Sequence, residues 1–472
     1  MSEKQKTMKK NTKVSAKEDE LLKLDAKYCS WGDTVHYSDK PNIFERAEGA
    51  YLYDREGIEF LDLQMWYSAV NFGYKNRRLN EALKRQIDEM PQLACQYLHK
   101  EKILLAAKIA QRAEMTFEAQ GRVHFNVGGA QAVEDSLKVV RNHTKKNLVF
   151  AFMGGYHGRT LGASAITSSY RYREKFGHFS DRALFVPYPY CFRCMYEKKR
   201  ESCDLYCLRQ FEKLFETEYY AILNKKNNEC EFGAFYVESV QGTGGYIIPP
   251  AEYFSGLKEI LDRYKILLID DEIQMGFCRT GKFWGIEHFN VVPDVIVFGK
   301  ALTNGLNPIS GIWAKEKLIS PQVFPPGSTH STFSANPLGT AIGLETMKLI
   351  EDSDFAVSVP RKGEYFLAQL RKLRKKYPQI GDVDGLGLAL RMEICQKDGF
   401  TPNRELTDAI ANIGLSGNLN TGGKKRGLIL DIGGYYKNVF TLAPSLFIEE
   451  GEIDLAVELF EEALKKGIAQ TA

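Results

Sequence analysis

The segment Val295-Ile296-Val297-Phe298-Gly299-Lys300 is a short apolar run that ends in a lysine. Its β-branched and aromatic residues predict a buried strand. A second apolar run, Ile266-Leu267-Leu268-Ile269, lies upstream and ends in Asp270-Asp271-Glu272. An amine and a carboxylate therefore each follow a buried strand. Open α/β sheets bind their ligands at that end of the strands, so the two segments predict an α/β fold with a site between them.

The pair Lys300 and Asp271 favours a particular kind of chemistry. A lysine at the end of a buried strand has little water around its charge, and desolvation lowers the pKa of an amine. An unprotonated amine is a nucleophile that can form a Schiff base with an aldehyde. Pyridoxal 5'-phosphate needs such an amine for its aldehyde and an acid for its ring nitrogen, so we interpret Lys300 and Asp271 as catalytic residues. Taken alone, Lys300 would more simply be a solvated lysine at a strand end.

The sequence around both residues resembles the core of the class III, or ω-type, pyridoxal-phosphate-dependent aminotransferases. The matching residues run in the same order, from Asp271-Glu272-Ile273-Gln274-Met275-Gly276-Phe277-Cys278-Arg279-Thr280-Gly281-Lys282 to Pro293-Asp294 and Lys300-Ala301-Leu302. The resemblance covers nearly the whole chain from about Asn42. It implies fold type I, in which a large domain carries a mainly parallel seven-stranded sheet between helices. A smaller α+β domain is built from both ends of the chain.

The spacing of apolar residues indicates where the elements of this fold lie. Short apolar runs alternate with amphipathic helices from about residue 78, which is typical of a mainly parallel sheet covered on both faces. The expected strands are 123–125, 148–152, 183–186, 234–237, 266–269 and 295–298. The expected division is a disordered tail (1–25), an N-terminal segment of the small domain (26–77), a large cofactor-binding domain (78–345) with a cysteine-rich insertion (188–210), and a C-terminal small domain (346–472).

Composition and charge exclude several classes of function. Hydrophobic residues make up 44% of the 472 residues and charged residues 26%, as in ordinary globular proteins. The formal net charge of +3 gives no reason to expect nucleic acid or an acidic membrane surface as a partner. No apolar stretch approaches the ~18 residues of a membrane span, and the first residues lack the apolar core of a secretory signal. We expect a cytoplasmic protein whose partners are small molecules.

Four of the nine cysteines form a compact group in the sequence. Cys191 and Cys194 are followed by Cys203 and Cys207, a spacing that could hold a structural zinc ion. The alternative is four reduced thiols in a surface insertion. The odd total argues against a disulfide framework.

The resemblance assigns several residues to the cofactor. The turn that contains Gly129 and Ala130 would hold the phosphate through amides at a helix N-terminus, although Gly128 stands where relatives usually have serine. Tyr156 would stack on the pyridine ring. His157, its usual neighbour, would support the ring or the substrate.

Three further residues match family positions around the cofactor. Gln274 would bind the 3-hydroxyl of the cofactor, and Glu238 would lie beside the substrate. Thr332 matches the threonine that contacts the phosphate from the neighbouring subunit. A site shared in this way implies a homodimer or a dimer of dimers.

Substrate recognition is where the chain departs from its relatives. The family arginine that clamps an α-carboxylate in ornithine- and 4-aminobutyrate-type enzymes is Thr441 here, and threonine cannot make that bidentate contact. Arg159 matches a position where some relatives bind a carboxylate, and Trp66 belongs to the segment that lines the family's substrate pocket. A coenzyme A thioester needs no carboxylate clamp, which suggests the acyl-CoA β-aminotransferases that act on 3-aminobutyryl-CoA or β-alanyl-CoA. The basic loop at 424–426 could meet coenzyme A phosphates, although a solvated run of charges is the simpler interpretation.

The resemblance implies a transaminase that moves an ω- or β-amino group from an amine to a keto acid such as 2-oxoglutarate. Lys300 would move the proton of the reacting carbon as general acid and base. A racemase or aminomutase of the same fold begins with the same proton abstraction and is the alternative. A binding protein without catalysis is disfavoured because both Lys300 and Asp271 are present.

Overall fold

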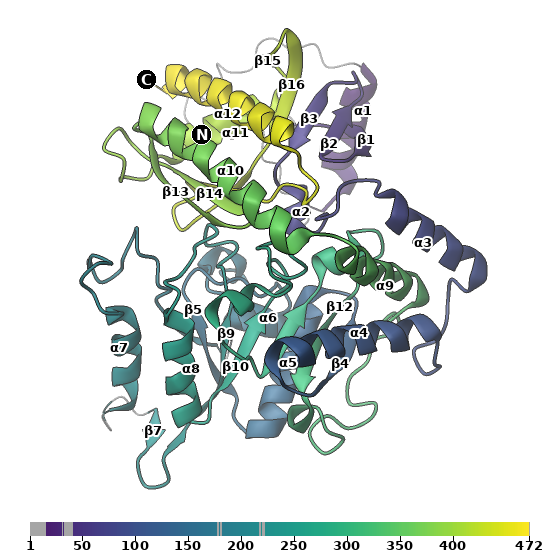
Figure 1. The fold of residues 1–472 in the computed structure, drawn as a ribbon, viewed down its shortest axis with the longest axis vertical. Helices are drawn as coiled ribbons and strands as arrows, with labels where there is room; N and C mark the ends of the chain where they lie inside the picture. The colour runs from purple at the N-terminus through teal and green to yellow at the C-terminus, as the bar shows by residue number, and fades with distance from the viewer. Residues whose placement is uncertain are drawn as a thin grey trace.

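A seven-stranded sheet forms the centre of the protein in this computed structural model, which describes residues 16–30, 32, 41–176, 179, 182–216, 219 and 222–471 (Figure 1). The strand order is β4-β12-β11-β10-β9-β5-β6. Six strands run in one direction, and β12 runs antiparallel to both of its neighbours. The strands are β4 (Gly121–Asn126), β5 (Leu148–Phe152), β6 (Leu184–Val186), β9 (Phe232–Val237), β10 (Leu267–Asp271), β11 (Val295–Phe298) and β12 (Ser310–Lys315). The expected mainly parallel, seven-stranded sheet is confirmed.

Both faces of this sheet are buried, which explains why its central strands read as unbroken apolar runs. Val295 and Val297 face one layer, where they pack with Val133 and Leu137 of α5. Ile296 and its neighbours on the opposite face pack in a second cluster with α4 and α8. The helices of this part are α3 (Arg77–Glu89), α4 (Lys100–Phe117), α5 (Gly129–Thr144), α6 (Leu161–Ile166), α7 (Tyr206–Glu212), α8 (Tyr253–Arg263) and α9 (Pro337–Glu351).

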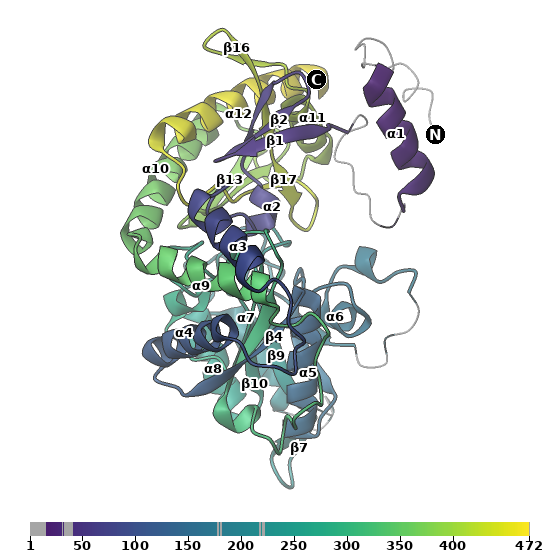
Figure 2. The same ribbon diagram turned by 90° about the vertical axis from the view of Figure 1, so that its right-hand side faces the viewer.

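The two ends of the chain meet in a second, smaller part that lies above the large sheet in Figure 1 and Figure 2. A five-stranded sheet has the order β1-β2-β3-β16-β15, and a four-stranded sheet has the order β13-β14-β18-β17. The joint between chain ends is the parallel pairing of β3 with β16. These strands are β1 (Phe44–Glu48), β2 (Tyr51–Asp54), β3 (Glu59–Asp62), β13 (Ile380–Leu386), β14 (Ala389–Ile394), β15 (Leu419–Thr421), β16 (Lys424–Ile429), β17 (Asp431–Gly433) and β18 (Val439–Leu442).

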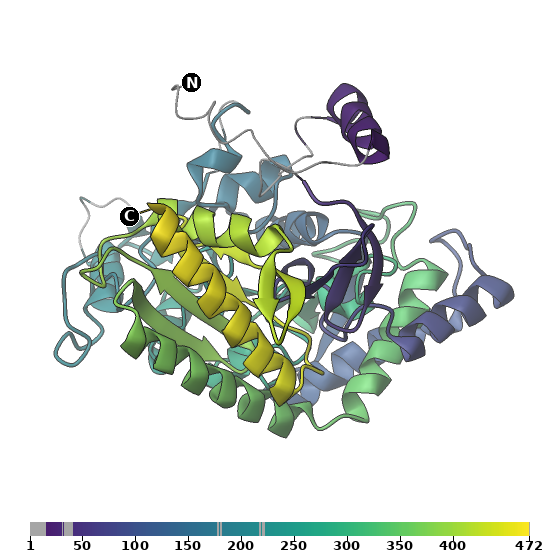
Figure 3. The same ribbon diagram turned by 90° about the horizontal axis from the view of Figure 1, so that it is seen from above.

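Long helices cover the small sheets. Figure 3 shows α12, drawn in yellow, lying beside α10. These helices are α10 (Phe355–Lys376), α11 (Arg404–Leu415) and α12 (Glu450–Thr471). The shorter elements are α2 (Met65–Ser68), the strand pair β7 (Leu223–Asn224) and β8 (Glu229–Cys230), and the 3-10 helices η2 (Tyr170–Tyr172), η3 (Lys213–Phe215), η5 (Gly285–Phe289), η6 (Lys300–Thr303) and η7 (Glu316–Leu318).

The structure corrects the expectation of a disordered tail through residue 25. Residues Ala16–Tyr28 form helix α1, and residues 1–15 of the expected tail lie outside the described residues. The segment AKEDELLKLDAKY consists mainly of alanine, leucine, lysine and glutamate, all strong helix formers. Low overall hydrophobicity indicated disorder, but local helix propensity favours a helix.

Strand β12 was not predicted from the sequence. Its residues, Ser310-Gly311-Ile312-Trp313-Ala314-Lys315, include glycine, alanine and lysine, which are uncommon in strands. Pairing with β11 and β4 compensates for the weak propensity. Within the described residues, no helix combines the length and apolar character that crossing a membrane requires.

Candidate active site

Two cavities meet at the carboxyl ends of the central strands. The inner cavity has a volume of about 450 Å³ and is lined by Gly129, Ala130, Tyr156, His157, Gly158, Arg159, Thr160, Glu238, Asp271, Ile273, Gln274 and Lys300. The outer cavity has a volume of about 560 Å³ and is lined by Tyr67, Tyr156, Arg159, Arg171, Tyr172, Gly242, Thr243, Gln274, Lys300, Arg404, Asp408, Asn412, Asp431, Ile432, Gly433 and Lys437. Lys300 borders both cavities, so one amine can reach groups in either.

Lys300 lies immediately after β11, in the first position of η6. Its φ of 43° is in the left-handed region, which is uncommon for a residue with a side chain. Burial lowers the pKa of the Lys300 amine, and the charges of Asp271 and Glu238 partly oppose this shift. The shift is toward the unprotonated, nucleophilic amine that was expected at this position.

Asp271 ends β10 and forms a buried pair with His157. The Nδ1 atom of His157 lies 2.8 Å from Oδ2 of Asp271, and the backbone N–H of Ile273 donates to Oδ1 at 3.1 Å. Burial lowers the pKa of His157, but the hydrogen bond and charge of Asp271 outweigh it and raise the pKa above its ordinary value. His157 thus orients the carboxylate of Asp271.

Glu238 follows β9 and is buried beside this pair. Its two carboxyl oxygens accept hydrogen bonds from the backbone N–H groups of Tyr156 and Gly242, each at 2.9 Å. Burial raises the pKa of Glu238 to about 7, although His157 and both amides favour the carboxylate. A carboxyl with this pKa can exchange a proton at neutral pH.

The N-terminus of α5 forms part of the wall of the inner cavity. Gly128 caps the helix without a side-chain contact, and Gly129 and Ala130 are its first residues. The first amides of a helix have no acceptor inside the helix and attract anions. A Cβ atom at Gly129 would lie 2.7 Å from Cδ1 of Ile273, so any side chain at this position would have to displace the end of Ile273.

Aromatic and amide side chains complete the region shared by the cavities. The ring of Tyr156 lies 5.2 Å from that of Tyr172 in an edge-on arrangement, and the guanidinium of Arg159 lies 4.6 Å from the Tyr172 ring centre. The Nε2 group of Gln274 donates to the hydroxyl of Tyr246 at 2.8 Å. Tyr156, Arg159 and Gln274 all line both cavities.

Three residues expected at the site lie away from the cavity walls. Trp66 is 57% exposed, and its neighbour Tyr67 lines the outer cavity instead. Thr332 is exposed in the loop between β12 and α9. Thr441 is buried behind the outer cavity, and its hydroxyl donates to Oδ2 of Asp431 at 2.6 Å.

Several lining residues of the outer cavity were missed by the sequence reasoning. Arg404, Asp408 and Asn412 come from one face of α11, and their spacing of four residues was the available signal. Asp431 and Lys437 come from β17 and the turn that follows it. These residues are polar positions in the C-terminal part of the chain, where the sequence pattern indicates only packing helices and strands. Only the tertiary structure shows that they line one cavity.

The zinc interpretation of the cysteine group is not supported. Cys191, Cys194, Cys203 and Cys207 line one small cavity as free thiols. In the part of the chain that the structure describes, no three His, Cys, Asp or Glu side chains are arranged to hold a metal ion. Burial raises the pKa of Cys191 to about 11 and also raises that of Cys207, so both thiols are protonated at neutral pH without a metal.

The inner cavity fits pyridoxal phosphate group by group. The Lys300 amine suits an aldehyde, the Asp271 carboxylate suits a protonated ring nitrogen, and the helix N-terminus at Gly129 suits a phosphate. No two of these three partners are adjacent in the sequence, yet they line one cavity.

Comparison with known proteins agrees with this chemistry. The family model "Aminotransferase class-III" matches residues 34–464. A leucine/methionine racemase from Thermococcus litoralis is 30% identical over 450 residues, which cover 95% of this chain and 96% of the racemase. A taurine–pyruvate aminotransferase from Bilophila wadsworthia is 30% identical over 459 residues, covering 94% and 96%.

A solved structure shows the same fold. An amine transaminase from an uncultivated Pseudomonas species, crystallised in its pyridoxal-phosphate-bound form, superposes with a TM-score of 0.81 at 25% identity and covers 92% of this chain and 97% of its own. The match of the family model extends over most of the chain. The chain therefore belongs to the class III aminotransferase family of pyridoxal-phosphate-dependent, fold type I enzymes.

Proposed function

We propose that this enzyme transfers a non-α amino group, at an ω or β position, from an amine substrate to a keto acid such as 2-oxoglutarate. The observation that carries the proposal is Thr441. Where ornithine- and 4-aminobutyrate-type relatives have an arginine, this chain has a hydroxyl that is already bonded to Asp431. A donor held by its α-carboxylate at this position would meet a carboxylate instead of a guanidinium, so the keto acid must be bound through other groups of the site.

The protein side chains have separate roles in this reaction. Pyridoxal phosphate, when bound, supplies an aldehyde carbon and a ring that withdraws electrons from the reacting substrate carbon. The Lys300 amine moves the proton of that carbon as general acid and base. Asp271 keeps a proton on the ring nitrogen, and His157 holds Asp271 in place.

Within this reaction class, we propose a β-aminoacyl thioester of coenzyme A as a donor. The missing carboxylate clamp supports it, because a thioester carries no carboxylate at that end. The basic loop at 424–426 does not add support: Lys424 and Arg426 both contact Glu59, at 3.1 and 3.0 Å. Neither side chain lines the outer cavity.

A racemase or aminomutase is the second candidate. The observation in its favour is that two relatives at 30% identity are named as racemases, one for leucine and methionine and one for alanine and serine. Both reaction types need the same proton transfer by Lys300. They differ in their later steps, because a racemase or aminomutase returns the amino group to the same molecule.

A half-reaction screen tests the proposal. Purified holoenzyme is mixed with ω-amino acids, β-aminoacyl thioesters and α-amino acids, and the visible absorbance of the bound cofactor is followed. We expect ω- or β-amines to remove this absorbance and an added keto acid to restore it. Turnover of an α-amino acid without any keto acid, detected as loss of optical rotation, would instead establish the racemase.

We also propose a homodimer, or a dimer of such dimers, located in the cytoplasm. Thr332 is exposed on its loop, where a neighbouring subunit's cofactor could reach it. The eight cysteines from Cys95 to Cys395 are free thiols, which suits a reducing compartment. Light scattering of the purified enzyme measures the assembly directly, and a monomer that is fully active would exclude the shared site.

A further inference from the structure

Positive charge gathers at one end of the outer cavity. Arg171 reaches it from η2, Arg404 from the first turn of α11, and Lys437 from the turn between β17 and β18. Three separate segments therefore supply cations to one wall. None of the three belongs to the inner cavity around the cofactor position.

Lys437 is the most constrained of these cations. Its φ of 55° is left-handed, and a hydrogen bond from its N–H to the carbonyl of Gly434 closes the turn that holds it. Burial lowers the pKa of the Lys437 amine; the charge of Asp431 opposes this shift, while Arg171 and Arg404 add to it. Among the described residues, no carboxylate lies within salt-bridge distance of this amine.

The other two cations are only weakly neutralised. Arg404 lies 3.4 Å from Asp408 on the same helix, but 69% of its side chain is exposed, so the pair is screened by water. Arg171 lies beside Tyr172, 5.9 Å from the ring centre, and forms no salt bridge within the described residues. The wall thus keeps unused capacity to bind a negative group.

One carboxylate of the outer cavity acts on both of its amines. The carboxylate of Asp431 raises the pKa of Lys300 and also that of Lys437, so it is near both amines. Lys300, Asp431 and the three cations all line this one cavity. A substrate whose amine reacts at Lys300 can therefore place its far end against Arg171, Arg404 and Lys437.

We infer that Arg171, Arg404 and Lys437 form an anion subsite that selects amines with a carboxylate or phosphate several bonds away from the reacting carbon. This inference rests on the proposed function and narrows its substrate class. The chain lacks an arginine at position 441, and cations from other segments of the same cavity bind the anionic end instead. Such a subsite distinguishes substrates by length as well as by charge.

Matched amines test the subsite. The holoenzyme is given hexylamine, ω-aminohexanoate and ω-aminohexyl phosphate, which share a chain but differ at the far end. We expect one or both anionic amines to react with a KM about tenfold lower than that of hexylamine, the effect of one charge-assisted hydrogen bond. The better of the two anionic amines identifies the group that the wall prefers.

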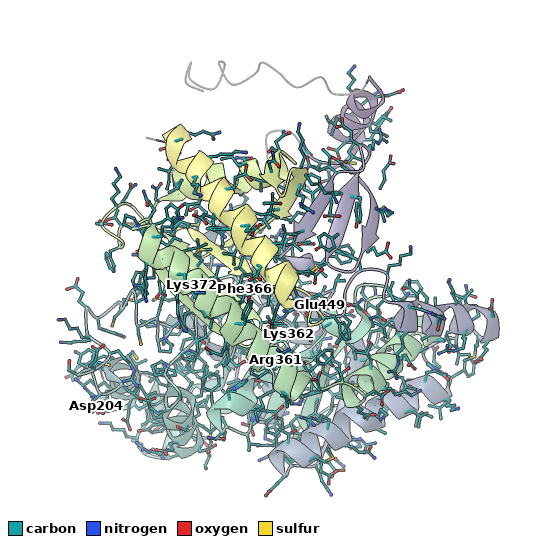
Figure 4. All side chains as sticks on the ribbon, turned by 45° about the horizontal axis from the view of Figure 1, so that its top comes forward. Asp204, Arg361, Lys362, Phe366, Lys372 and Glu449 are labelled. Atoms are coloured by element: carbon teal, nitrogen blue, oxygen red, sulfur yellow. The ribbon has the colours of Figure 1, made fainter. Side chains whose placement is uncertain are left out.

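Variants locate the effect at the wall. Lys437→Gln should raise KM for the preferred anionic amine about tenfold and leave hexylamine within about twofold, while Lys437→Arg keeps the preference. The matched control is Lys372→Gln, because Lys372 is an exposed lysine of α10 whose amine donates to Gln369 at 3.0 Å, away from the outer cavity (Figure 4). Calorimetric titration with adipate, a dianion without an amine, gives a readout that does not depend on turnover. Its affinity should fall in Lys437→Gln and not in Lys372→Gln.

The outcomes distinguish a failure of the anion subsite from a failure of the proposed function. If hexylamine reacts as well as both anionic amines, or if Lys437→Gln affects all three equally, the subsite is refuted and the transaminase proposal stands. If no amine removes the cofactor absorbance with any variant, the proposed function itself fails.

Discussion

The two charged side chains at the carboxyl ends of β10 and β11 form the chemical centre of the structure. Lys300 and Asp271 could be predicted because each ends an apolar strand, where a charge is unusual. Glu238 could be placed by resemblance, but its pKa of about 7 follows from burial that only the fold creates. Asp431 could not be predicted at all, because nothing in its local sequence separates it from an ordinary strand end.

Replacing Lys300 by alanine tests the central assignment. We expect Lys300→Ala to lower kcat about a thousandfold, since both the nucleophile and the proton carrier are lost. Borohydride treatment followed by mass spectrometry should add the cofactor mass to the parent enzyme and not to the variant. Covalent labelling of Lys300→Ala at another lysine would contradict the assignment.

Glu238 should make stability depend on pH. Its folded pKa lies above that of a free glutamic acid, so its stabilising contribution is complete in acid and is lost as the pH rises to about 7. Between about pH 5.5 and pH 8 the loss amounts to roughly 2 kcal/mol, and Glu238→Gln should avoid it. Thermal unfolding at both pH values measures the difference. Equal pH dependence in parent and variant would show that Glu238 titrates normally.

At the element scale, strands buried on both faces are the elements that the sequence predicts best. Strand β11 is an unbroken apolar run because one face packs on α5 and the other on α4 and α8. Strand β12 is equally buried, but the backbone of His124 lies so close to position 311 that only glycine fits there. The glycine interrupts the apolar run by which a buried strand is predicted. Helix α1 was missed for a different reason. The polar composition of the N-terminal residues predicted disorder, although the residues of α1 have high helix propensity.

The N-terminus of α5 gives a test at this scale. We expect Gly129→Val to weaken binding of pyridoxal phosphate at least about tenfold, because the added side chain would push against Ile273 and displace the phosphate-binding amides. Absorbance titration of the apoenzyme measures the affinity. Gly129→Ala combined with Ile273→Ala should bind more tightly than Gly129→Ala alone; no such recovery would mean that the contact is not the cause.

At the scale of the whole molecule, the outer cavity shows where sequence reasoning stops. Its walls combine residues from η2, α11 and β17, which are distant in the chain and have no shared motif. The inner cavity was predictable because its residues follow strands of one parallel sheet. The outer cavity depends on how the small sheets are placed on the large one, which local patterns do not encode.

The joint between β3 and β16 gives a test of that placement. Gly427 lies against Phe60, and an added Cβ would fall inside the contact distance of its ring. We expect Gly427→Val to lower the free energy of unfolding by about 1–3 kcal/mol, the usual effect of overpacking a core. Gly451→Val is the control, because a Cβ there meets nothing within 4 Å. Denaturant unfolding compares them, and equal losses would show that the joint tolerates the added volume.

The same joint has a consequence for synthesis on the ribosome. Glu59 and Arg426, which face each other across it, are separated by 367 positions. The first three strands therefore leave the exit tunnel long before their parallel neighbour has been translated. Until then β3 presents an open edge, the kind of surface on which nascent chains associate wrongly. Chains released before residue 424 should consequently depend on chaperones and precipitate, while the large sheet, complete by Lys315, can already have formed.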